Sequence, residues 1–473
     1  MSLAELTFLP AASMADRIRE KQLSPVELVE AHLARIEKLN PRLNAFVEID
    51  AEGARQVAQR AEAALRANEP LGPLHGVPIS IKSSIDVKGL HCEAGTKLRA
   101  GFVASQDAPL VKRLREAGAV ILGNTNTPEL LMAWETDNLL YGRTNNPWDL
   151  ERTPGGSSGG EAAAIASGCS AGGVGSDGGG SIRVPAHFVG ICGLKPTPGR
   201  IPATGHFPTS VGPFALLGVV GPMARTVGDL KLLFEIMQGP DDGDTSSAPV
   251  PVRWPSDDEV KQLRIGYFED DGRTPVTPET KEAIRTAASA LRGAGFRVEA
   301  FRPERLEQAR DLWWKFFGVA GAMLLGPMTK GREAVLSPIL KQFSGWVAAH
   351  PSHTADSLLD TWIIRDALRI DIFSQMHEHP VLLCPVTSIP AFRHGERDWQ
   401  VAGQRVSYLD AWSYCAWFNL LGMPAAVVPV GESKEGLPIG VQIVAKPWCE
   451  ELALSVAAVV EKECGGWRRP PIE

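Results

Sequence analysis

Short apolar runs alternate with amphipathic stretches along most of the chain, a pattern typical of α/β proteins. Val77, Ile79 and Ile81 recur at every second position and predict a strand. A helix is expected from Leu110 to Ala117, and residues 119–122 read as a buried strand after it. Strand patterns return at 263–267, 381–384 and 439–444. Alternating strands and helices predict a central sheet covered by helices on both faces.

Two longer segments are expected to be mainly helical. The first seventy residues contain Val29, Leu33 and Ile36 at helical spacing after Ser24-Pro25, which suits a helix start. Residues 303–380 also have a helical pattern and carry many aromatic side chains: Trp313, Trp314, Phe316, Phe317, Phe343 and Trp346. Strand patterns lie on both sides of this second segment, so we interpret it as an insertion into one sheet domain.

These boundaries predict a single domain over residues 1–473. It consists of N-terminal helices (1–70), a core (71–238) and a helical insertion (303–380) that lines the pocket. Residues 239–258 are rich in Pro, Asp and Ser and are expected to form a loop between the core and the remaining strands.

Composition narrows the classes of function. The chain has 473 residues, 44% of them hydrophobic, and a net charge of −7 without a Lys/Arg block, which argues against nucleic-acid binding. It shows neither a secretory signal pattern nor an apolar run long enough for a membrane span. The seven cysteines include no Cys-x-x-Cys pair and indicate reduced thiols. We therefore expect a cytoplasmic protein.

Candidate chemistry concentrates in two Gly/Ser-rich turns that stand 24 residues apart. The first is Gly155-Gly156-Ser157-Ser158-Gly159-Gly160, and the second runs from Ser176 through Gly178-Gly179-Gly180-Ser181 to Arg183. Both precede helix-prone sequence, so unpaired N–H groups at a helix start would point towards the serines. Such fixed donors stabilise a tetrahedral oxyanion, and Gly178, Gly179, Gly180 and Ser181 are the candidates.

A serine hydroxyl needs a base before it becomes a good nucleophile. The residues around the two turns offer no obvious histidine, whereas Lys82 ends the strand of Ile79 and Ile81. Its pKa would have to fall by roughly three units from about 10.4, a shift that burial of a lysine can produce. We expect Ser158 and Ser176 to be hydrogen-bond partners, and Asp177 and Arg183 to orient the glycine turn.

Two other motifs overlap the same turns. Gly155-x-Ser157-x-Gly159 matches the nucleophile elbow of α/β-hydrolases, which would make Ser157 the nucleophile. Histidines do follow it, so this alternative stays open, although it leaves the second serine turn without a purpose. Gly173-x-Gly175-x-x-Gly178 matches a dinucleotide fingerprint, but the acidic residue expected about twenty positions later is missing, and we reject that reading.

The motifs together resemble the amidase signature family. The resemblance rests on Val77 to Lys82, the two serine turns, Gly190 to Thr197 and Gly221 to Arg225, and it returns at Asn419 to Ala425. It implies an α/β fold with a mixed central sheet. It also implies a Ser-Ser-Lys triad in which Ser181 attacks the carbonyl, Ser157, on a cis peptide, relays the proton, and Lys82 is the base. Neither a metal nor an organic cofactor is implied.

The substrate class follows from a departure within that resemblance. Glutamine-using members carry an acidic residue seven positions before the residue that matches Asn419, and here that position is Trp412. We therefore expect a hydrophobic acyl or aryl amide, as in fatty-acid-amide-hydrolase-like or aryl-acylamidase-like members, with esters and carbamates as further candidates. Met132, Trp134 and Trp412 are the candidate substrate-binding residues.

Two alternatives to this function remain. One is the glutamine-hydrolysing subunit of a tRNA-dependent amidotransferase, which would require companion subunits. The other is a catalytically silent scaffold that binds a partner through the helical segment. The expected partner is otherwise a small amide, and a homodimer through the N-terminal helices stays open.

Overall fold

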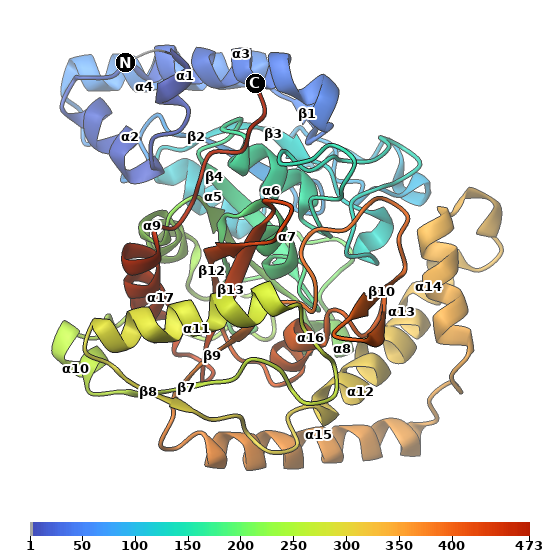
Figure 1. Cartoon of the computed structure of the whole chain (residues 1–473). Coiled ribbons are helices and arrows are strands. Elements are labelled where there is room, and N and C mark those ends of the chain that lie inside the picture. Colours follow the sequence, from blue (N-terminus) through green and yellow to red (C-terminus); the bar gives the residue numbers. More distant parts are fainter. Residues whose placement is uncertain (1–2) are drawn as a thin grey trace.

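One large mixed sheet forms the centre of the computed structural model, which describes residues 3–473. Among these residues, eleven strands pair in the order β1-β3-β2-β4-β6-β5-β12-β13-β9-β7-β8, and β10 and β11 form a separate hairpin (Figure 1). The strands are β1 (Phe46–Ile49), β2 (Pro78–Lys82), β3 (Val120–Thr125), β4 (Gly172–Asp177), β5 (Cys192–Lys195), β6 (Val219–Ala224), β7 (Arg264–Tyr267), β8 (Arg297–Ala300), β9 (Val381–Pro385), β10 (Asp398–Val401), β11 (Gln404–Ser407), β12 (Ala425–Glu432) and β13 (Pro438–Ala445).

Helices cover both faces of the sheet, as the alternation of strand and helix patterns predicts. The α-helices are α1 (Leu3–Leu6), α2 (Ala11–Arg19), α3 (Pro25–Leu43), α4 (Ala51–Ala67), α5 (Pro109–Glu116), α6 (Gly159–Ala166), α7 (Arg183–Val189), α8 (Pro213–Leu217), α9 (Val227–Met237), α10 (Asp257–Lys261), α11 (Pro278–Gly293), α12 (Gln308–Trp314), α13 (Gly321–Thr329), α14 (Pro338–Ala348), α15 (Ala355–Gln375), α16 (Ser413–Leu420) and α17 (Glu450–Cys464). Short 3₁₀ turns occupy Lys97–Arg99, Glu129–Leu131 and Glu333–Val335, and a π-helical turn spans Lys315–Ala320.

The strands show how the two faces are divided. In β13, Ile439, Val441 and Ile443 point into the apolar core on the side of α9, α11 and α17, and Val444 joins the core on the side of α7 and α16. Side chains alternate between the faces of a strand, so a nearly continuous apolar run fills both cores. The same alternation in β2 places Ile79 and Ile81 in the apolar core on the side of α9, α11 and α17.

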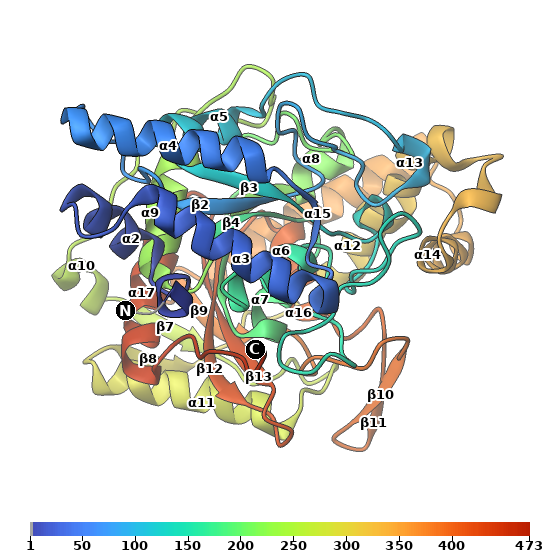
Figure 2. The same cartoon turned by 90° about the horizontal axis from the view of Figure 1, so that it is seen from above.

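The N-terminal region contains a short strand in addition to the expected helices. Phe46–Ile49 forms strand β1 at the sheet edge and pairs antiparallel with β3, where Phe46 faces Thr125. Asn44 ends α3 in the left-handed conformation, with φ of 50°, and turns the chain into this strand. Four residues are too few for a clear period-two signal, and for that reason the sequence did not reveal the strand. Helices α3 and α4 lie over this end of the sheet (Figure 2).

The segment expected to be helical between residues 303 and 380 contains α12 to α15 and lies between β8 and β9. Because β9 pairs with β7 in the central sheet, the chain leaves the sheet edge, forms these helices and returns to the same sheet. Figure 1 shows α12 and α13 next to α8 and α16 on one side of the molecule. Within residues 3–473, no helix combines the length and hydrophobicity needed to cross a bilayer. The seven cysteines are free thiols.

Candidate active site

Lys82 ends strand β2, and its side chain is fully buried among serine hydroxyls. Its Nζ atom lies 2.7 Å from Ser157 Oγ and 3.0 Å from both Ser158 Oγ and Ser176 Oγ. Ser158 is fixed in turn, because its hydroxyl donates to the Ser176 carbonyl oxygen and accepts from the Ser176 N–H, each at 3.2 Å. Three hydroxyls thus hold the amine, and Ser157 is the nearest.

The environment of Lys82 favours its neutral form. Burial lowers the pKa of Lys82 well below its usual range, because the ammonium ion loses its hydration there. The carboxyl groups of Asp177 and Glu161 oppose this shift and do not cancel it. A neutral amine keeps a lone pair, and this lone pair can accept a proton from the Ser157 hydroxyl.

Ser157 lies in the first glycine turn, directly before α6. The Gly156–Ser157 peptide bond is cis, in agreement with the expectation for this serine. The Thr127 hydroxyl donates to the Ser157 carbonyl oxygen at 2.9 Å and fixes the turn on that side. A β-carbon on Gly156 would lie 2.5 Å from the Glu135 carbonyl oxygen, so the close approach of these two backbone segments requires glycine.

Ser181 lies in the second turn and opens on the same cavity as Ser157. The two turns are joined directly, because the Ser158 N–H donates to the Ser181 carbonyl oxygen at 3.1 Å. The Ser181 residue is 8% exposed, the value of a side chain that faces a cavity rather than bulk solvent. The structure therefore gathers the three predicted residues, Lys82, Ser157 and Ser181, around one buried site.

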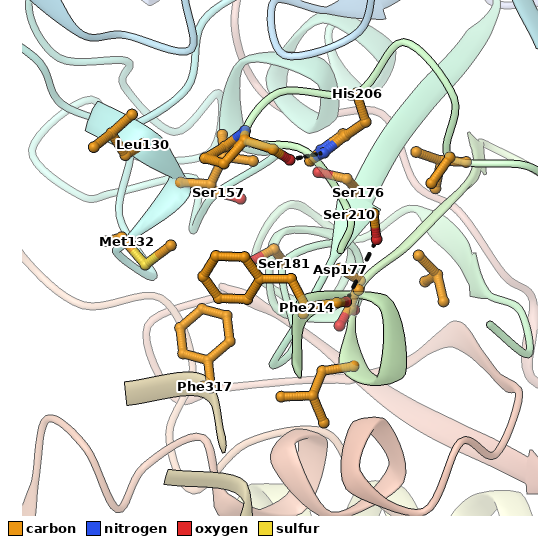
Figure 3. Close-up of a pocket in the computed structure, with 18 residues that line it drawn as sticks. Leu130, Met132, Ser157, Ser176, Asp177, Ser181, His206, Ser210, Phe214 and Phe317 are labelled. Carbon is orange, nitrogen blue, oxygen red and sulfur yellow. Dashed lines mark hydrogen bonds between the residues drawn. The ribbon is translucent and has the colours of Figure 1, made fainter. Parts of the chain in front are cut away.

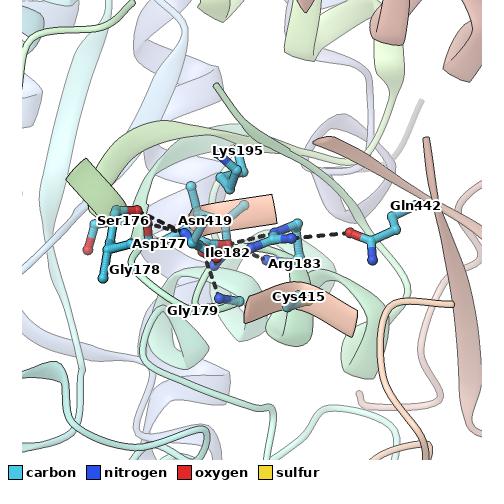
Figure 4. Close-up of polar contacts among 12 residues, drawn as sticks. Ser176, Asp177, Gly178, Gly179, Ile182, Arg183, Lys195, Cys415, Asn419 and Gln442 are labelled. Atoms are coloured by element: carbon cyan, nitrogen blue, oxygen red, sulfur yellow. Dashed lines mark hydrogen bonds and ion pairs between the residues drawn. The ribbon is translucent and has the colours of Figure 1, made fainter. Parts of the chain in front are cut away.

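A buried ion pair holds the second turn in shape (Figure 4). The Asp177 carboxylate accepts from the Gly180 N–H at 2.7 Å and from the Ile182 N–H at 3.1 Å. Arg183 donates to the same carboxylate through Nε and Nη2, each at 3.0 Å, and Asn419 Nδ2 donates to Oδ1 at 3.0 Å. These contacts confirm that Asp177 and Arg183 orient the glycine turn.

The same contacts correct the expected set of oxyanion donors. Gly180 was included, but its N–H is committed to Asp177 at 2.7 Å and is not free to bind an oxyanion. Gly178, Gly179 and Ser181 remain the candidate donors. The sequence could not separate Gly180 from its neighbours, because an Asx-type bond within the turn depends on backbone dihedrals that glycine leaves open.

A cavity lies beside the two serines and opens partly to solvent (Figure 3). Its polar end carries Ser157, Ser176, Asp177, Ser181 and His206. The rest of the wall is largely apolar and includes Leu130, Leu131, Met132, Phe214, Leu217 and Phe317. A second, smaller space also reaches Ser181 and lies among Met132, Trp134, Phe317 and Phe343.

The three predicted substrate-binding residues have different positions. Met132 lines both spaces, and Trp134 lines the smaller one. Trp134 also donates from Nε1 to the Gly179 carbonyl oxygen at 2.9 Å, which ties it to the glycine turn. Trp412 lines neither space: its fully buried ring stacks on Trp134 with centroids 5.6 Å apart.

Several wall residues were missed. Phe317 belongs to the helical segment of residues 303–380. The sequence predicts that this segment is helical but does not show which of its aromatic rings faces the cavity. Leu130 and Leu131 form a turn with φ of 50° and 66°, a conformation that leucine rarely adopts. His206 precedes the cis Phe207–Pro208 bond, and its Nδ1 contacts the Pro208 carbonyl oxygen at 2.9 Å. Burial lowers the pKa of His206 to about 4, so this wall residue is neutral.

Comparison with known proteins identifies relatives over nearly the whole chain. The family model named Amidase matches residues 27–454. An indoleacetamide hydrolase of Bradyrhizobium diazoefficiens is 36% identical and covers 96% of this chain and 86% of its own length. An acylamidase of Rhodococcus erythropolis is 35% identical, with 98% and 96% covered. A glutamyl-tRNA(Gln) amidotransferase subunit of Moorella thermoacetica is 33% identical, and 99% of each chain is covered.

A solved structure is similar over nearly the whole chain. A bacterial aryl acylamidase described as belonging to the amidase signature enzymes superposes with a TM-score of 0.85 at 27% sequence identity. The match covers 96% of both chains. It confirms the predicted α/β fold, with its mixed sheet and covering helices.

Proposed function

This chain belongs to the amidase family and is an amide-hydrolysing enzyme, and on that basis we propose that Ser181 is its nucleophile, Ser157 its proton relay and Lys82 its base. The observation that carries the proposal is the 2.7 Å contact between Lys82 Nζ and Ser157 Oγ at a fully buried lysine. We also propose that the whole chain acts as one catalytic domain.

The reaction begins when Ser181 Oγ attacks the carbonyl carbon of the amide. The Ser181 proton passes to Ser157 Oγ, and the Ser157 proton passes to Lys82 Nζ, which becomes an ammonium ion. The carbonyl oxygen becomes an oxyanion, and the N–H groups of Gly178, Gly179 and Ser181 are the candidate donors to it. These donors stabilise charge that exists only in the transition state and the intermediate.

Collapse of the tetrahedral intermediate breaks the carbon–nitrogen bond. The leaving amine takes a proton back from Lys82 through Ser157, and Ser181 keeps the acyl group as an ester. A water molecule then attacks this ester, and the same two residues accept its proton. The carboxylic acid leaves, and Ser181 recovers its hydroxyl.

Hydrophobic acyl or aryl amides fit the cavity best. Phe214, Phe317 and Met132 stand close to Ser181 in Figure 3, and apolar side chains make up most of the wall. An indoleacetamide hydrolase and an acylamidase among the relatives support this class. The shared acyl transfer extends the proposal to activated esters and aryl carbamates, and an enzyme inert towards both would remove that extension.

The glutamine-hydrolysing role in an amidotransferase is the second candidate, because one such protein matches the chain over 99% of both lengths. Glutamine carries an ammonium group, which calls for a carboxylate that is not already paired. Among the described residues that line the cavity, Asp177 is the carboxylate, and its Oδ1 lies 3.0 Å from Nη2 of Arg183 in an ion pair. The cavity therefore favours an uncharged substrate over glutamine.

A substrate panel tests this proposal. The purified chain should release amines from aryl and long-chain amides faster than from acetamide or glutamine, without a companion protein. Ser181→Ala should abolish release, whereas Ser374→Ala, on the exposed side of α15, should leave it unchanged. Use of glutamine only with companion subunits would support the second candidate, and unchanged hydrolysis by Ser181→Ala would reject the nucleophile. A chain inert to every amide would support the silent scaffold.

A further inference from the structure

A fully buried carboxyl group, Glu161, lies next to the site without a cation bound to it. It is the third residue of α6, which starts directly after the turn of Ser157. Ser80 Oγ donates to Glu161 Oε1 at 2.5 Å, and Thr125 Oγ1 donates to Oε2 at 2.7 Å. The space is made by Gly173, since a β-carbon there would lie 2.0 Å from Oε1. Two neutral hydroxyls thus hold a carboxyl group that has lost its contact with water.

The strands place this carboxyl group beneath Lys82. Ser80 and Lys82 are two positions apart on β2 and therefore share one face of the sheet. Thr125 on β3 pairs in register with Lys82. Of the two hydroxyl donors to Glu161, Ser80 thus lies on the same strand face as Lys82, and Thr125 lies beside Lys82 on the neighbouring strand. The charges of Lys82 and Glu161 interact electrostatically.

Glu161 differs from the other charged or titratable groups around Lys82 in having no other cation to neutralise it within the described residues. The facing groups that carry charge or titrate are Asp177 at the end of β4, Glu161 on α6 and His206 in the loop beyond. Asp177 is neutralised by Arg183, and both side chains are fully buried. His206 is neutral, because burial and then Lys82 lower its pKa to about 4. Glu161 alone among them lacks another cation within the described residues.

We propose that Glu161 is the counter-ion of Lys82, which stabilises the ammonium form that arises during acyl transfer. This rests on the proposed function, in which Lys82 gains a proton for part of each cycle. A buried ammonium ion is costly unless an opposite charge lies nearby. Glu161 touches neither the substrate nor the reacting atoms, so it is a positioning residue that acts through Lys82.

The titration of Glu161 suits this role. Burial raises the pKa of Glu161 to about 7, against the opposing effects of the Ser80 and Thr125 hydroxyls and of Lys82. The carboxyl group therefore changes charge near neutral pH, where its ionisation responds to the charge on Lys82. A carboxyl group that was always ionised would favour the ammonium form of Lys82 throughout the cycle and make the amine harder to deprotonate.

The test compares Glu161→Gln, which keeps the shape and removes the charge, with Glu161→Asp, which keeps the charge. The measurement is kcat/KM against pH with an uncharged aryl amide. In Glu161→Gln the acidic limb should move to lower pH by about one unit, because the ammonium form of Lys82 loses its counter-charge. The plateau should fall about tenfold for the same reason. Glu161→Asp should keep the limb near that of the unaltered enzyme.

An acidic limb that stays in place in Glu161→Gln, or moves equally in both variants, would overturn the proposal. If Glu161→Gln does not fold, Thr125→Val removes one hydroxyl that favours the ionised carboxyl, and an unmoved limb there has the same meaning. Labelling of Ser181 by a fluorophosphonate distinguishes a failure of the role of Glu161 from a failure of the proposed function. A labelled Ser181 with an unmoved limb rejects Glu161 alone, whereas an unlabelled Ser181 in the unaltered enzyme rejects the proposed function.

Discussion

The indole N–H of Trp313 donates to the Gly178 carbonyl oxygen at 2.8 Å, which connects the helical segment to the turn of Ser181. The carbonyl and N–H groups of one peptide unit point in opposite directions, so this bond directs the Gly179 N–H away from Trp313. A β-carbon on Gly179 would lie 2.3 Å from the Trp313 ring, and glycine is therefore required for the contact. The ring of α12 thus orients one of the candidate oxyanion donors.

Trp313→Phe should lower kcat about tenfold and change KM little. The variant keeps an aromatic ring on the glycine turn but lets the Gly178–Gly179 peptide rotate, and oriented donors matter mainly in the transition state. Steady-state kinetics with an aryl amide measures both constants. Trp314→Phe is the matched control, because the Trp314 indole donates to His350 Nδ1 at 3.4 Å and not to the turn. A tenfold loss in both variants would contradict a specific role for Trp313.

The low pKa of Lys82 predicts how activity depends on pH. The neutral amine is required, so kcat/KM should fall as the pH drops through the pKa that Lys82 has in the folded enzyme, and should level off above it. Lys82→Arg keeps a positive charge at all these pH values and should lose at least about 100-fold in kcat. Lys341→Arg, on the exposed side of α14, is the control. Substantial activity in Lys82→Arg would exclude Lys82 as the base.

Glu129 should affect substrate binding through the turn that follows it. Its buried carboxylate accepts from Thr96 Oγ1 at 2.8 Å and from the Ser337 N–H, at the start of α14, at 2.6 Å. It thereby holds Leu130 and Leu131, the wall residues with positive φ, against the helical segment. Loss of hydrogen bonds to a charged group of this kind costs about 1.5–3 kcal/mol.

We therefore expect Glu129→Ala to raise KM for bulky aryl amides about tenfold, with a smaller change for acetamide. The comparison of the two substrates separates a wall effect from general damage. Glu333→Ala removes an exposed carboxylate from the 3₁₀ turn before α14 and should change neither KM. Equal increases in KM for large and small substrates would argue against the assignment.

The pair of Asp177 and Arg183 should dominate stability at the site. Removal of one partner leaves a buried charge unpaired, so Arg183→Met should lower the free energy of unfolding by about 3–5 kcal/mol in urea. Burial alone would raise the pKa of Asp177, but Arg183 outweighs it and the pKa lies below the usual range. The ionised carboxylate thus contributes stability above the usual Asp pKa of about 3.9, and this contribution is lost as the pH falls below it.

In Arg183→Met the acid unfolding midpoint should accordingly move to higher pH. Arg253→Met breaks an exposed ion pair with Glu259 and should leave the midpoint in place, because surface pairs are screened by water. Circular dichroism over a pH series follows both variants. An Arg183→Met midpoint that matches the unaltered chain would show that the pair is not a source of acid stability.

The sequence predicted the parts of the structure that local patterns determine. Val77, Ile79 and Ile81 alternate as a strand, and that strand places Lys82 at its end, beside the serine turns. The sequence did not predict β1, which is four residues long, or the β10–β11 hairpin. Strand β1 depends on pairing with the distant β3, and each strand of the hairpin is only four residues long, so neither leaves a clear pattern in its own sequence.

At the site, the sequence identified residue types but not their orientation. Gly180 and Gly179 are equivalent in the sequence, yet the carboxylate of Asp177 takes the N–H of Gly180. The position of Trp412 relative to Asn419 predicts a cavity residue. In the folded chain its ring instead stacks on Trp134 and is fully buried. Which aromatic ring faces a cavity depends on contacts between distant segments, and these contacts appear only in the folded chain.

Covalent trapping is the sharpest test of Ser181 as the activated nucleophile. The purified chain is treated with a fluorophosphonate, its intact mass is measured, and the modified residue is located by peptide mapping. We expect one adduct, on Ser181, and none in Lys82→Ala, which lacks the base. An adduct on Ser157, or no adduct on the unaltered chain, would contradict this role of Ser181.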